Sequence, residues 1–507
     1  MLSAIAAGIV LGIMTWRIWR FTIQPLLHPD EPNEVPYWVP FMGPLSTFTG
    51  GLDKTITREM KRSNSRSPFA LTSLGTTLCI VTDPVDVSDV NRRSTAFTLE
   101  PLAKNLLLKF EISKPSVDRL FYHYVNENDK GRGQRGTGVL NATDTILDLY
   151  RQHLSPGNQL NAFLEGDIIP RMTRILSPTK LGLDTGTEET KTISVSLHNL
   201  CTQSLVNGIV RSYYGDIIAD LQPDFAGRYI AWEKASWKFL TGLPKFLSRD
   251  MLSAKGDMIG LFEEYFSLSH EERGHSNFWV ESVERLLRGL GLSNGEIARM
   301  FMLHTSSIIG NMYKLSFWLL AHILHDRALL KAITTEILPA VDPQTQAVNH
   351  TYLTENCPLL DSLYSEVLRL VVTSPMTRYV SETSTIGGKT LREGSKVLII
   401  YRHLHTNESI WGPTPSLLQP SRFLHDKTLK TNVSYRPWGG GKHVCPGRFL
   451  AKKAVFTFVA LLLGQYNLNL DGDQRFPRAD LAKASGVLSW AEGEDVLVSL
   501  KHRGEGD

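Results

Sequence analysis

The stretch from Tyr435 to Gly447, YRPWGGGKHVCPG, constrains this chain more than any other, because three glycines, a basic pair and a cysteine stand directly before a helical pattern. The pattern reads RFLAKKAVFTFVALLL and contains no proline. Pro446 suits the first turn of a helix, where its missing N–H leaves nothing unsatisfied. The sequence therefore predicts a glycine-rich loop that carries Cys445 and opens into a long helix.

Cys445 stands in surroundings that favour a charged sulfur. A lone cysteine is usually a small buried hydrophobe. Here the amides at the start of the next helix, together with Lys442 and His443, favour a thiolate over a thiol. Such a sulfur acts either as a nucleophile or as a soft metal ligand. No protease-type signature surrounds Cys445. The glycines permit close approach to a flat, bulky ligand, so a heme held by a cysteinate fits the stretch.

The overall composition excludes several other classes of protein. The formal net charge is +3 over 507 residues, so nothing argues for binding nucleic acid through bulk charge. The cysteines form no CxxC or Cys/His cluster, which disfavours a structural zinc site. Sparse cysteine usage fits a reducing compartment better than a disulfide-linked scaffold. The four cysteines are Cys79, Cys201, Cys357 and Cys445.

The N-terminus departs from the composition of a soluble protein. The segment Met1–Trp16 has no charged side chain, and Arg17 and Arg20 follow it. A bilayer core needs about 20 helical residues, and snorkelling arginines extend the span to Ile23. A cleaved signal peptide is the alternative, but it starts with basic residues, whereas no Lys or Arg precedes this run. We expect a retained anchor over residues 1–23, with the following domain on the cytosolic side.

A proline-rich segment follows over residues 24–44, and repeated prolines make a stiff, extended connector. We expect it to act as a hinge that holds the domain at a set angle to the membrane. Beyond it no linker is long enough to divide the chain, so residues 45–507 are predicted to form one domain. Mostly helical patterns, with strand-like runs such as LCIVT and KVLIIY, predict a mainly α fold with a small β region.

Two short motifs match cofactor-binding or catalytic patterns without the context that those patterns need. Gly131–Gly136 matches GxGxxG, but polar and charged residues precede it where a dinucleotide site requires a strand. We interpret residues 126–138 as a solvated loop. Gly291–Gly295 matches the GxSxG of a hydrolase, but the sequence before it has helical spacing instead of the required strand.

Ser293 has a simpler interpretation as the start of a helix, because it stands three residues before Glu296 in the spacing of a capping box. We predict that it is the N-cap of a long helix that begins at Asn294. No proline interrupts this pattern before Pro339. About thirty residues at 1.5 Å each span roughly 45 Å, enough to cross a whole domain.

The residues around Cys445 resemble the heme-binding loop of the cytochrome P450 superfamily, which reads aromatic-x-x-Gly-x-basic-x-Cys-x-Gly. The matching positions here are Trp438, Gly441, His443, Cys445 and Gly447. The family usually has Phe where this chain has Trp438, which is a mild departure.

Other motifs of the family recur in the correct order. Residues 366–369, EVLR, resemble the Glu-x-x-Arg of the K helix, although alone such a pair is most often a surface ion pair. Residues 420–423, PSRF, resemble the family's Pro-x-Arg-Phe. The resemblance implies that Arg422 joins Glu366 and Arg369 in one network. The run before Pro-x-Arg-Phe is matched by His405, Asn407, Trp411 and Pro413.

The resemblance implies a heme-thiolate fold with heme b as its cofactor and Cys445 as the axial ligand of the iron. Arg378 and His443 resemble the residues that contact the two heme propionates. The cofactor-binding residues implied in this way are Cys445, His443, Arg378, Trp438, Gly441 and Gly447.

The resemblance also implies partners and a location. Electrons come from NADPH through a separate reductase, since no segment of this chain reads as a flavin or nicotinamide domain. The anchor and hinge match microsomal members. They imply a single-pass protein of the endoplasmic reticulum membrane with a cytosolic catalytic domain and a lipophilic small-molecule substrate.

The long helix departs from the pattern of oxygen-activating members, which carry small-Gly-x-acid-Thr there. The best register places residues 308–312, IIGNM, at these positions, so that Asn311 replaces the acid and Met312 the threonine. Asn is not a proton donor of comparable acidity, and a thioether carries no proton. Gly310, Asn311 and Met312 are the predicted catalytic positions. Protons would reach them through water, with Ser306, Ser307 or His304 as helpers, although such a histidine is more often a core residue.

Two functions remain open at this point. Gly-Asn-Met followed by residues 316–318, SFW, resembles the branch that contains sterol hydroxylases of bile-acid synthesis and prostacyclin synthase. Those hydroxylases use dioxygen despite an Asn, whereas prostacyclin synthase isomerises an endoperoxide. The chain is therefore either a monooxygenase or an oxygen-independent isomerase or dehydratase, and a heme-binding protein without catalysis fits the complete motif set less well. The run CPGRFLA resembles filamentous-fungal members, which indicates secondary metabolism.

Overall fold

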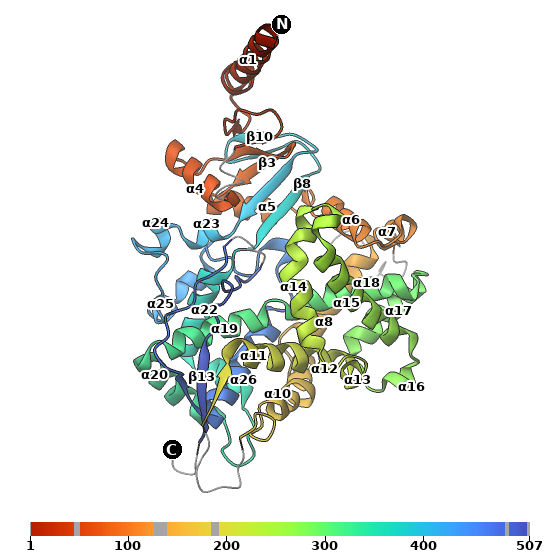
Figure 1. Cartoon of the computed structure of the whole chain (residues 1–507), viewed down its shortest axis with the longest axis vertical. Helices are drawn as coiled ribbons and strands as arrows, with labels where there is room; N and C mark the ends of the chain where they lie inside the picture. The colour runs from red at the N-terminus through yellow and green to blue at the C-terminus, as the bar shows by residue number, and fades with distance from the viewer. Residues whose placement is uncertain are drawn as a thin grey trace. The chain divides into compact units, whose positions relative to one another are not determined.

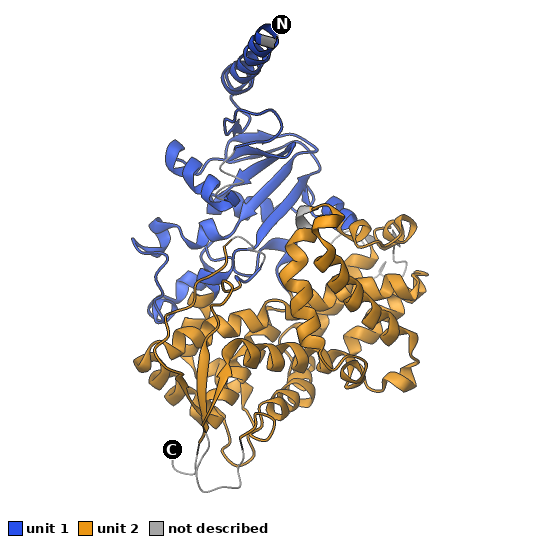
Figure 2. Cartoon of the chain, viewed as in Figure 1, with its two compact units in different colours: residues 1–105, 368–445, 484–488 blue, residues 106–367, 446–483, 489–507 orange. Residues whose placement is uncertain are grey.

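The computed structural model describes residues 2–44, 51–122, 124–125, 139–183, 192–481 and 486–503 (Figure 1). The chain forms two compact units, each built from separate stretches of sequence (Figure 2). The predicted mainly α fold with a small β region is confirmed, because helices dominate the described chain and the strands form four small sheets. The interpretation of residues 126–138 as a solvated loop lies outside the described residues. Unit 1 comprises Met1–Asn105, Leu368–Cys445 and Ala484–Leu488, and unit 2 comprises Leu106–Val367, Pro446–Lys483 and Ser489–Asp507.

Unit 1 begins with one continuous helix made of α1 (Leu2–Ile18), a π-helical turn η1 (Trp19–Ile23) and α2 (Gln24–Leu27). The stretch Ser3–Leu27 is long and apolar enough to cross a membrane, by its length and composition. The helix therefore continues past Ile23 into the segment expected to be a hinge. That segment also contributes the short strand β1 (Asn33–Glu34).

The segment after this helix is held against the end of the helix by several contacts. Arg17 donates to the carbonyl oxygen of Tyr37 and lies 4.0 Å above the ring of Trp38. Arg20 forms an ion pair with Glu34, with 2.7 Å between Nε and Oε2. These contacts give the end of the helix a fixed direction relative to the sheet that follows.

The main sheet of unit 1 has six strands in the order β1-β2-β3-β11-β8-β4. The runs LCIVT and KVLIIY lie in β3 and β11, which pair in parallel, so both predicted strands are confirmed. Both faces of this sheet are covered, because alternate residues such as Val397 and Leu398 belong to two separate buried clusters. The other strands and helices of unit 1 are β2 (Phe69–Ser73), β3 (Thr76–Val81), β4 (Phe97–Thr98), β8 (Pro375–Val380), β9 (Ser384–Ile386), β10 (Lys389–Leu391), β11 (Lys396–Ile400), α4 (Gly51–Ser63), α5 (Pro84–Arg92), α23 (Arg402–His405), α24 (Glu408–Trp411) and α25 (Arg422–His425).

Unit 2 is built mainly from helices packed around α18 (Asn294–Ile309) and α19 (Met312–Leu324). A three-stranded sheet in the order β12-β13-β7 completes it. Two helices, α6 (Glu100–Lys109) and α22 (Pro358–Val371), contain a boundary between the units. The other elements of unit 2 are α7 (Lys114–Leu120), α8 (Ala142–Leu154), α9 (Asn158–Phe163), α10 (Ile169–Ile175), α11 (Leu197–Thr202), α12 (Gly208–Tyr214), α13 (Ile217–Leu221), α14 (Phe225–Thr241), α15 (Arg249–Ser267), α16 (His270–Arg273), α17 (Phe278–Gly289), α20 (Arg327–Ile337), α21 (His350–Glu355), α26 (Arg448–Gln465), β5 (Tyr124–Val125), β6 (Val139–Leu140), β7 (Thr192–Ser196), β12 (Tyr466–Leu470) and β13 (Leu497–His502).

The predicted capping box at the start of α18 is confirmed. The Ser293 hydroxyl accepts a hydrogen bond from the Glu296 amide at 3.3 Å, and the Glu296 carboxylate accepts one from the Ser293 amide at 3.0 Å. The prediction of one uninterrupted helix is wrong, because α18 ends at Ile309 and α19 begins at Met312. The predicted helix contains no proline, so the sequence showed no sign of this break, which falls on Gly310 and Asn311.

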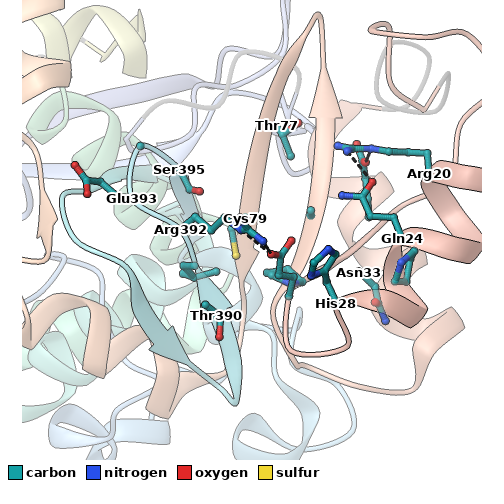
Figure 3. A pocket seen from close by; sticks show the side chains of 17 residues that line it. Arg20, Gln24, His28, Asn33, Thr77, Cys79, Thr390, Arg392, Glu393 and Ser395 are labelled. Atoms are coloured by element: carbon teal, nitrogen blue, oxygen red, sulfur yellow. Dashed lines mark hydrogen bonds and ion pairs between the residues drawn. The ribbon is translucent and has the colours of Figure 1, made fainter.

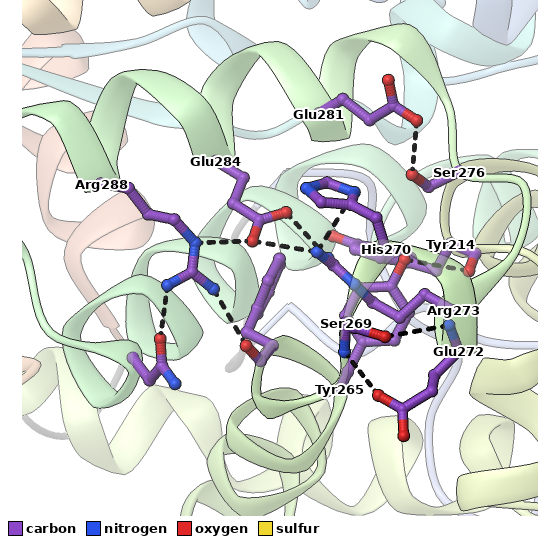
Figure 4. Close-up of polar contacts among 12 residues, drawn as sticks. Tyr214, Tyr265, Ser269, His270, Glu272, Arg273, Ser276, Glu281, Glu284 and Arg288 are labelled. Atoms are coloured by element: carbon purple, nitrogen blue, oxygen red, sulfur yellow. Dashed lines mark hydrogen bonds and ion pairs between the residues drawn. The ribbon is translucent and has the colours of Figure 1, made fainter.

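A buried ion pair joins α16 to α17 in unit 2 (Figure 4). Arg273 and Glu284 lie 2.8 Å apart, and each side chain is 2% exposed. Arg288 adds a second guanidinium at 2.8 Å from the same carboxylate and donates to the carbonyl oxygen of Phe266. Burial raises the pKa of Glu284, but the two guanidinium groups lower it further, so the carboxyl keeps a pKa below its usual value.

Candidate cofactor and active site

The loop that carries Cys445 is closed by its own backbone. The Cys445 amide donates to the carbonyl oxygen of Trp438 at 2.9 Å, and a single 3-10 turn covers Gly441–His443. The predicted helix follows as α26, which starts at Arg448 with Gly447 as its N-cap. Pro446 therefore precedes the helix instead of forming its first turn.

Cys445 differs from the other cysteines in its exposure. It is half-buried, whereas Cys79, Cys201 and Cys357 are buried. Burial raises the pKa of Cys79 and of Cys357 to about 12 and that of Cys201 well above its ordinary value. Those three sulfurs remain thiols at neutral pH, so Cys445 is the cysteine best placed to act as a ligand or a nucleophile.

The glycines of this loop allow it to lie directly on α5. Gly441 has a φ of +64°, and a Cβ atom there would lie 2.0 Å from the carbonyl oxygen of Asn91. A Cβ atom on Gly440 would lie 2.7 Å from Asn91 Nδ2. Gly439 also has a positive φ, of +76°. Side chains at Gly440 or Gly441 would lift the loop off the helix, which is a role that the sequence did not reveal.

Arg378 on β8 offers a buried positive charge to an anion. Its side chain is 1% exposed, Nη1 donates to the carbonyl oxygen of Thr377 at 3.2 Å, and Nη2 is buried without a hydrogen-bond partner. Burial lowers the pKa of Arg378, and the Tyr401 hydroxyl opposes that shift. No carboxylate pairs with Arg378 among the described residues. A buried guanidinium is stable when an anion compensates it, so this residue fits a heme propionate.

Arg369 and Arg422 hold the segment from His405 to Pro415 through its backbone carbonyl groups. Arg369 Nη1 donates to the oxygens of His405 and Pro415 at 2.7 and 2.6 Å, and its guanidinium lies 5.0 Å from the ring of Trp411. Arg422 Nη1 donates to the carbonyl oxygen of Trp411 at 2.9 Å. Glu366 is fully buried one turn before Arg369 on α22, and its place in the same network stays a prediction.

His405 links this segment to the start of the cysteine loop. Its Nε2 atom accepts a hydrogen bond from the amide of Arg436 at 3.1 Å, and Arg436 Nη2 donates to the hydroxyl of Ser88 on α5. Burial and the positive charge of Arg369 lower the pKa of His405 to about 3. The ring is therefore neutral at physiological pH and acts as a fixed acceptor.

Asn311 and Met312 occupy different faces at the break between α18 and α19. Asn311 is exposed, as is Ser307 four residues earlier, so these two lie on one open face of the helix. Met312 is 4% exposed and packs in the core with the start of α19. Of the three predicted catalytic positions, Asn311 is exposed, whereas Gly310 and Met312 are buried, and their catalytic roles stay a prediction.

A tyrosine from α14 lies behind the helix break. A Cβ atom on Gly310 would lie 2.8 Å from the hydroxyl oxygen of Tyr229 and 2.6 Å from the carbonyl oxygen of Ser306. Glu233, one turn further along α14, forms an ion pair with Lys314. A carboxylate therefore lies behind the break although residues 308–312 contain none. Nothing in the spacing of α14 distinguished this residue in advance.

The other polar residues named on this helix are engaged within unit 2. Ser306 and Ser307 each donate to the carbonyl oxygen four residues earlier, at 2.9 and 3.0 Å. His304 Nδ1 lies 3.0 Å from the hydroxyl of Tyr150, and its ring centre is 5.2 Å from that of Trp279. Burial lowers the pKa of His304 to about 4, so it is a neutral core residue.

Comparison with known proteins accounts for this set of residues. The family model described as Cytochrome P450 matches residues 314–495, a range that contains Glu366, Arg369, Arg378, Arg422 and Cys445. Over this range the chain is similar to the cytochrome P450 superfamily. This similarity implies a heme-thiolate iron cofactor, and the mainly α fold with small sheets agrees with it.

Individual relatives include fungal and animal P450 proteins. The chain is 24% identical to cytochrome P450 monooxygenase nodJ of Hypoxylon pulicicidum over 62% of this chain and 64% of that protein. It is 22% identical to cytochrome P450 monooxygenase poxD of Penicillium oxalicum over 90% and 91%. It is 28% identical to prostacyclin synthase of Rattus norvegicus over 46% and 50%. The chain thus spans less than two thirds of the length of the first of these relatives.

Proposed function

We propose that this chain is a heme-thiolate monooxygenase that oxidises a lipophilic small molecule. The observation that carries the proposal is the Cys445 loop, which is closed by the Trp438 carbonyl and holds the one cysteine of the four that is not buried. The similarity to two fungal proteins named as monooxygenases supports the reaction type. The run CPGRFLA, which resembles filamentous-fungal members, favours a place in fungal secondary metabolism.

Cys445 would hold the heme iron, while Arg378 and His443 would bind the propionates. A thiolate-held heme, when bound, supplies the activation of an oxygen–oxygen bond. Trp438 would keep the loop closed through its carbonyl oxygen, Gly441 would seat the loop on α5, and Gly447 would cap α26. Asn311 would present its amide, which both donates and accepts hydrogen bonds, to a ligand on the open face of the helix.

We also propose a redox partner and a membrane location for the protein. Electrons from NADPH would arrive through a separate reductase. The apolar helix Ser3–Leu27 would anchor the protein in the endoplasmic reticulum membrane with its catalytic domain in the cytosol. A substrate that partitions into lipid would then be concentrated at the same surface.

An oxygen-independent isomerase or dehydratase is the alternative. It is favoured by Asn311, because the open face carries neither an acid nor a threonine hydroxyl at the helix break. The similarity to rat prostacyclin synthase supports the same alternative.

The deciding experiment needs no substrate. Microsomes that contain the full chain and a matched NADPH reductase are placed under carbon monoxide, and the Soret band is recorded. A red-shifted ferrous–CO band with NADPH alone is the expected result. If a strong chemical reductant is required in every condition, the isomerase or dehydratase is favoured. Cys445→Ala is expected to abolish the red-shifted band, whereas Cys357→Ala, which alters a buried thiol elsewhere, retains it.

A further inference from the structure

A cavity of about 520 Å³ lies in unit 1 where the apolar helix meets the sheet (Figure 3). It is lined by the end of the apolar helix, the residues that lead from it into β1, the strands β1, β2, β3 and β10, and the turn between β10 and β11. Its charged lining residues come from both sides, namely Arg20, Glu31, Glu34, Arg392 and Glu393. The size falls in the range of small-ligand sites, about 300–1,000 Å³.

Four of the charged residues form two ion pairs, one at the end of the apolar helix and one at the turn between β10 and β11. Arg20 binds Glu34 at 2.7 Å, and Arg392 Nε donates to Glu31 at 2.6 Å. A guanidinium has five N–H donors in a planar fork. The contacts of Arg392 with Glu31 use two donor nitrogens, and its side chain is 65% exposed. The cavity therefore holds both a donor fork suited to phosphate and carboxylates suited to an ammonium group.

The length of the apolar helix sets the depth of this cavity relative to the bilayer. Its 25 residues, Ser3–Leu27, span about 37 Å, whereas the hydrocarbon core of a bilayer is about 30 Å thick. A core of that thickness takes up about 20 residues, 3–22, so Gln24 falls in the headgroup layer and the Arg20 side chain reaches that layer by snorkelling. Trp19 and Trp38 are exposed beside them, and tryptophan side chains favour that layer.

We propose that this cavity binds the headgroup of a zwitterionic phospholipid. The phosphodiester lies against Arg392 and Arg20, and the ammonium group lies against Glu31 and Glu34. Because the lining comes from the helix and from the sheet, a bound headgroup ties the membrane span to unit 1. The inference rests on the proposed anchor and not on the proposed heme chemistry.

The test uses the full chain in a maltoside detergent, free of phospholipid. Glycerophosphoethanolamine and glycerophosphocholine, which are water-soluble headgroups, are titrated by calorimetry, with inorganic phosphate and ethanolamine as comparison ligands. Saturable binding of at least one headgroup is expected, and Arg392→Gln or Glu31→Gln weakens it about tenfold through loss of one charge-assisted contact. Arg62→Gln is the matched control, because Arg62 is also 65% exposed and ion-paired, with Glu59 on α4.

Three results would overturn the proposal. They are the lack of saturable binding, binding of inorganic phosphate as tight as that of both headgroups, and an equal loss in Arg62→Gln. The thermal midpoint of each variant identifies misfolding, and Glu31→Gln provides a second variant if Arg392→Gln is unstable. The ferrous–CO band of the same samples reports separately on the proposed function. Headgroup binding without that band leaves this inference intact.

Discussion

The backbone of Gly441 lies so close to Asn91 that a methyl group on it would stand 2.0 Å from the Asn91 carbonyl oxygen. This contact seats the cysteine loop on α5, and the φ of +64° at Gly441 turns the chain into the 3-10 turn before Cys445. Glycine is thus needed at this position for two reasons: a Cβ atom would collide with Asn91, and the backbone φ is positive. The loop holds its sulfur through packing against a helix from a distant part of the sequence.

Gly441→Ala is expected to displace the loop. A positive φ costs an alanine about 1–2 kcal/mol, and the collision with a backbone oxygen adds to that cost. Gly388→Ala is the matched control, since Gly388 has a φ of +74° but open space around it. Measured by urea unfolding, Gly388→Ala should lose about 1–2 kcal/mol and Gly441→Ala clearly more, with loss of the red-shifted ferrous–CO band. Equal effects of the two variants would contradict the packing argument.

Arg378→Met is expected to have opposite effects in the two forms of the protein. Without heme, the variant removes a buried charge that lacks a carboxylate partner among the described residues, so the free energy of unfolding should stay equal or rise by about 1–3 kcal/mol. With heme, it would remove the proposed partner of a propionate, so transfer of heme to apomyoglobin should accelerate. Arg92→Met, at an arginine that is 81% exposed, should change neither quantity. Unchanged heme release in Arg378→Met would refute the role of Arg378.

The sequence predicted the features that depend on neighbouring residues. The Ser293–Glu296 capping box and the loop before α26 are set by local spacing, and both are present. The approach of Asn91 to Gly441 and that of Tyr229 to Gly310 join residues far apart in the chain, so no spacing rule identifies them.

The break between α18 and α19 also shows what residue spacing alone cannot predict. Successive residues on a helix point about 100° apart, so an aligned motif does not by itself decide which of two neighbours faces a ligand. In the structure Asn311 is exposed and Met312 is buried.

Gly310→Ala and Tyr229→Phe are expected to interact. The added methyl group collides with the Tyr229 hydroxyl at 2.8 Å and with the Ser306 carbonyl at 2.6 Å, and Tyr229→Phe removes the first collision. Gly310→Ala alone should therefore destabilise the protein, and the double variant should recover about 1 kcal/mol relative to the sum of the single changes. A double-mutant cycle from urea unfolding measures this energy. Strict additivity would show that Tyr229 does not confine Gly310.

Glu284→Gln should be strongly destabilising, because it leaves the 2%-exposed Arg273 without its anion. Breaking a buried pair costs about 3–5 kcal/mol, while replacing both partners by apolar residues is often nearly neutral. The double variant Arg273→Met/Glu284→Met should therefore be more stable than Glu284→Gln alone. Asp118→Asn removes an exposed ion pair with Lys114 and should cost less than about 1 kcal/mol. The urea unfolding midpoints of the three variants test this expectation, and that of Glu284→Gln should be the lowest.

His153→Phe should flatten the dependence of stability on pH. Burial lowers the pKa of His153 to about 4, whereas an unfolded histidine titrates near 6.5. The unfolded state therefore binds the extra proton first, and stability falls as the pH drops from about 6.5 towards 4.

Between pH 7 and pH 5 this single group should cost about 2 kcal/mol. Phenylalanine keeps the packing against Phe163 and Tyr213, whose ring centres lie 4.7 and 5.9 Å away, and His153 Nε2 has no hydrogen-bond partner to lose. The variant should thus match the parent at pH 7 and exceed it at pH 5, as measured by urea unfolding at both values. His275→Gln, at a histidine that is 75% exposed, should retain the parent's slope. A parental slope in His153→Phe would mean that His153 is already protonated, or reaches water, in the folded protein at pH 5.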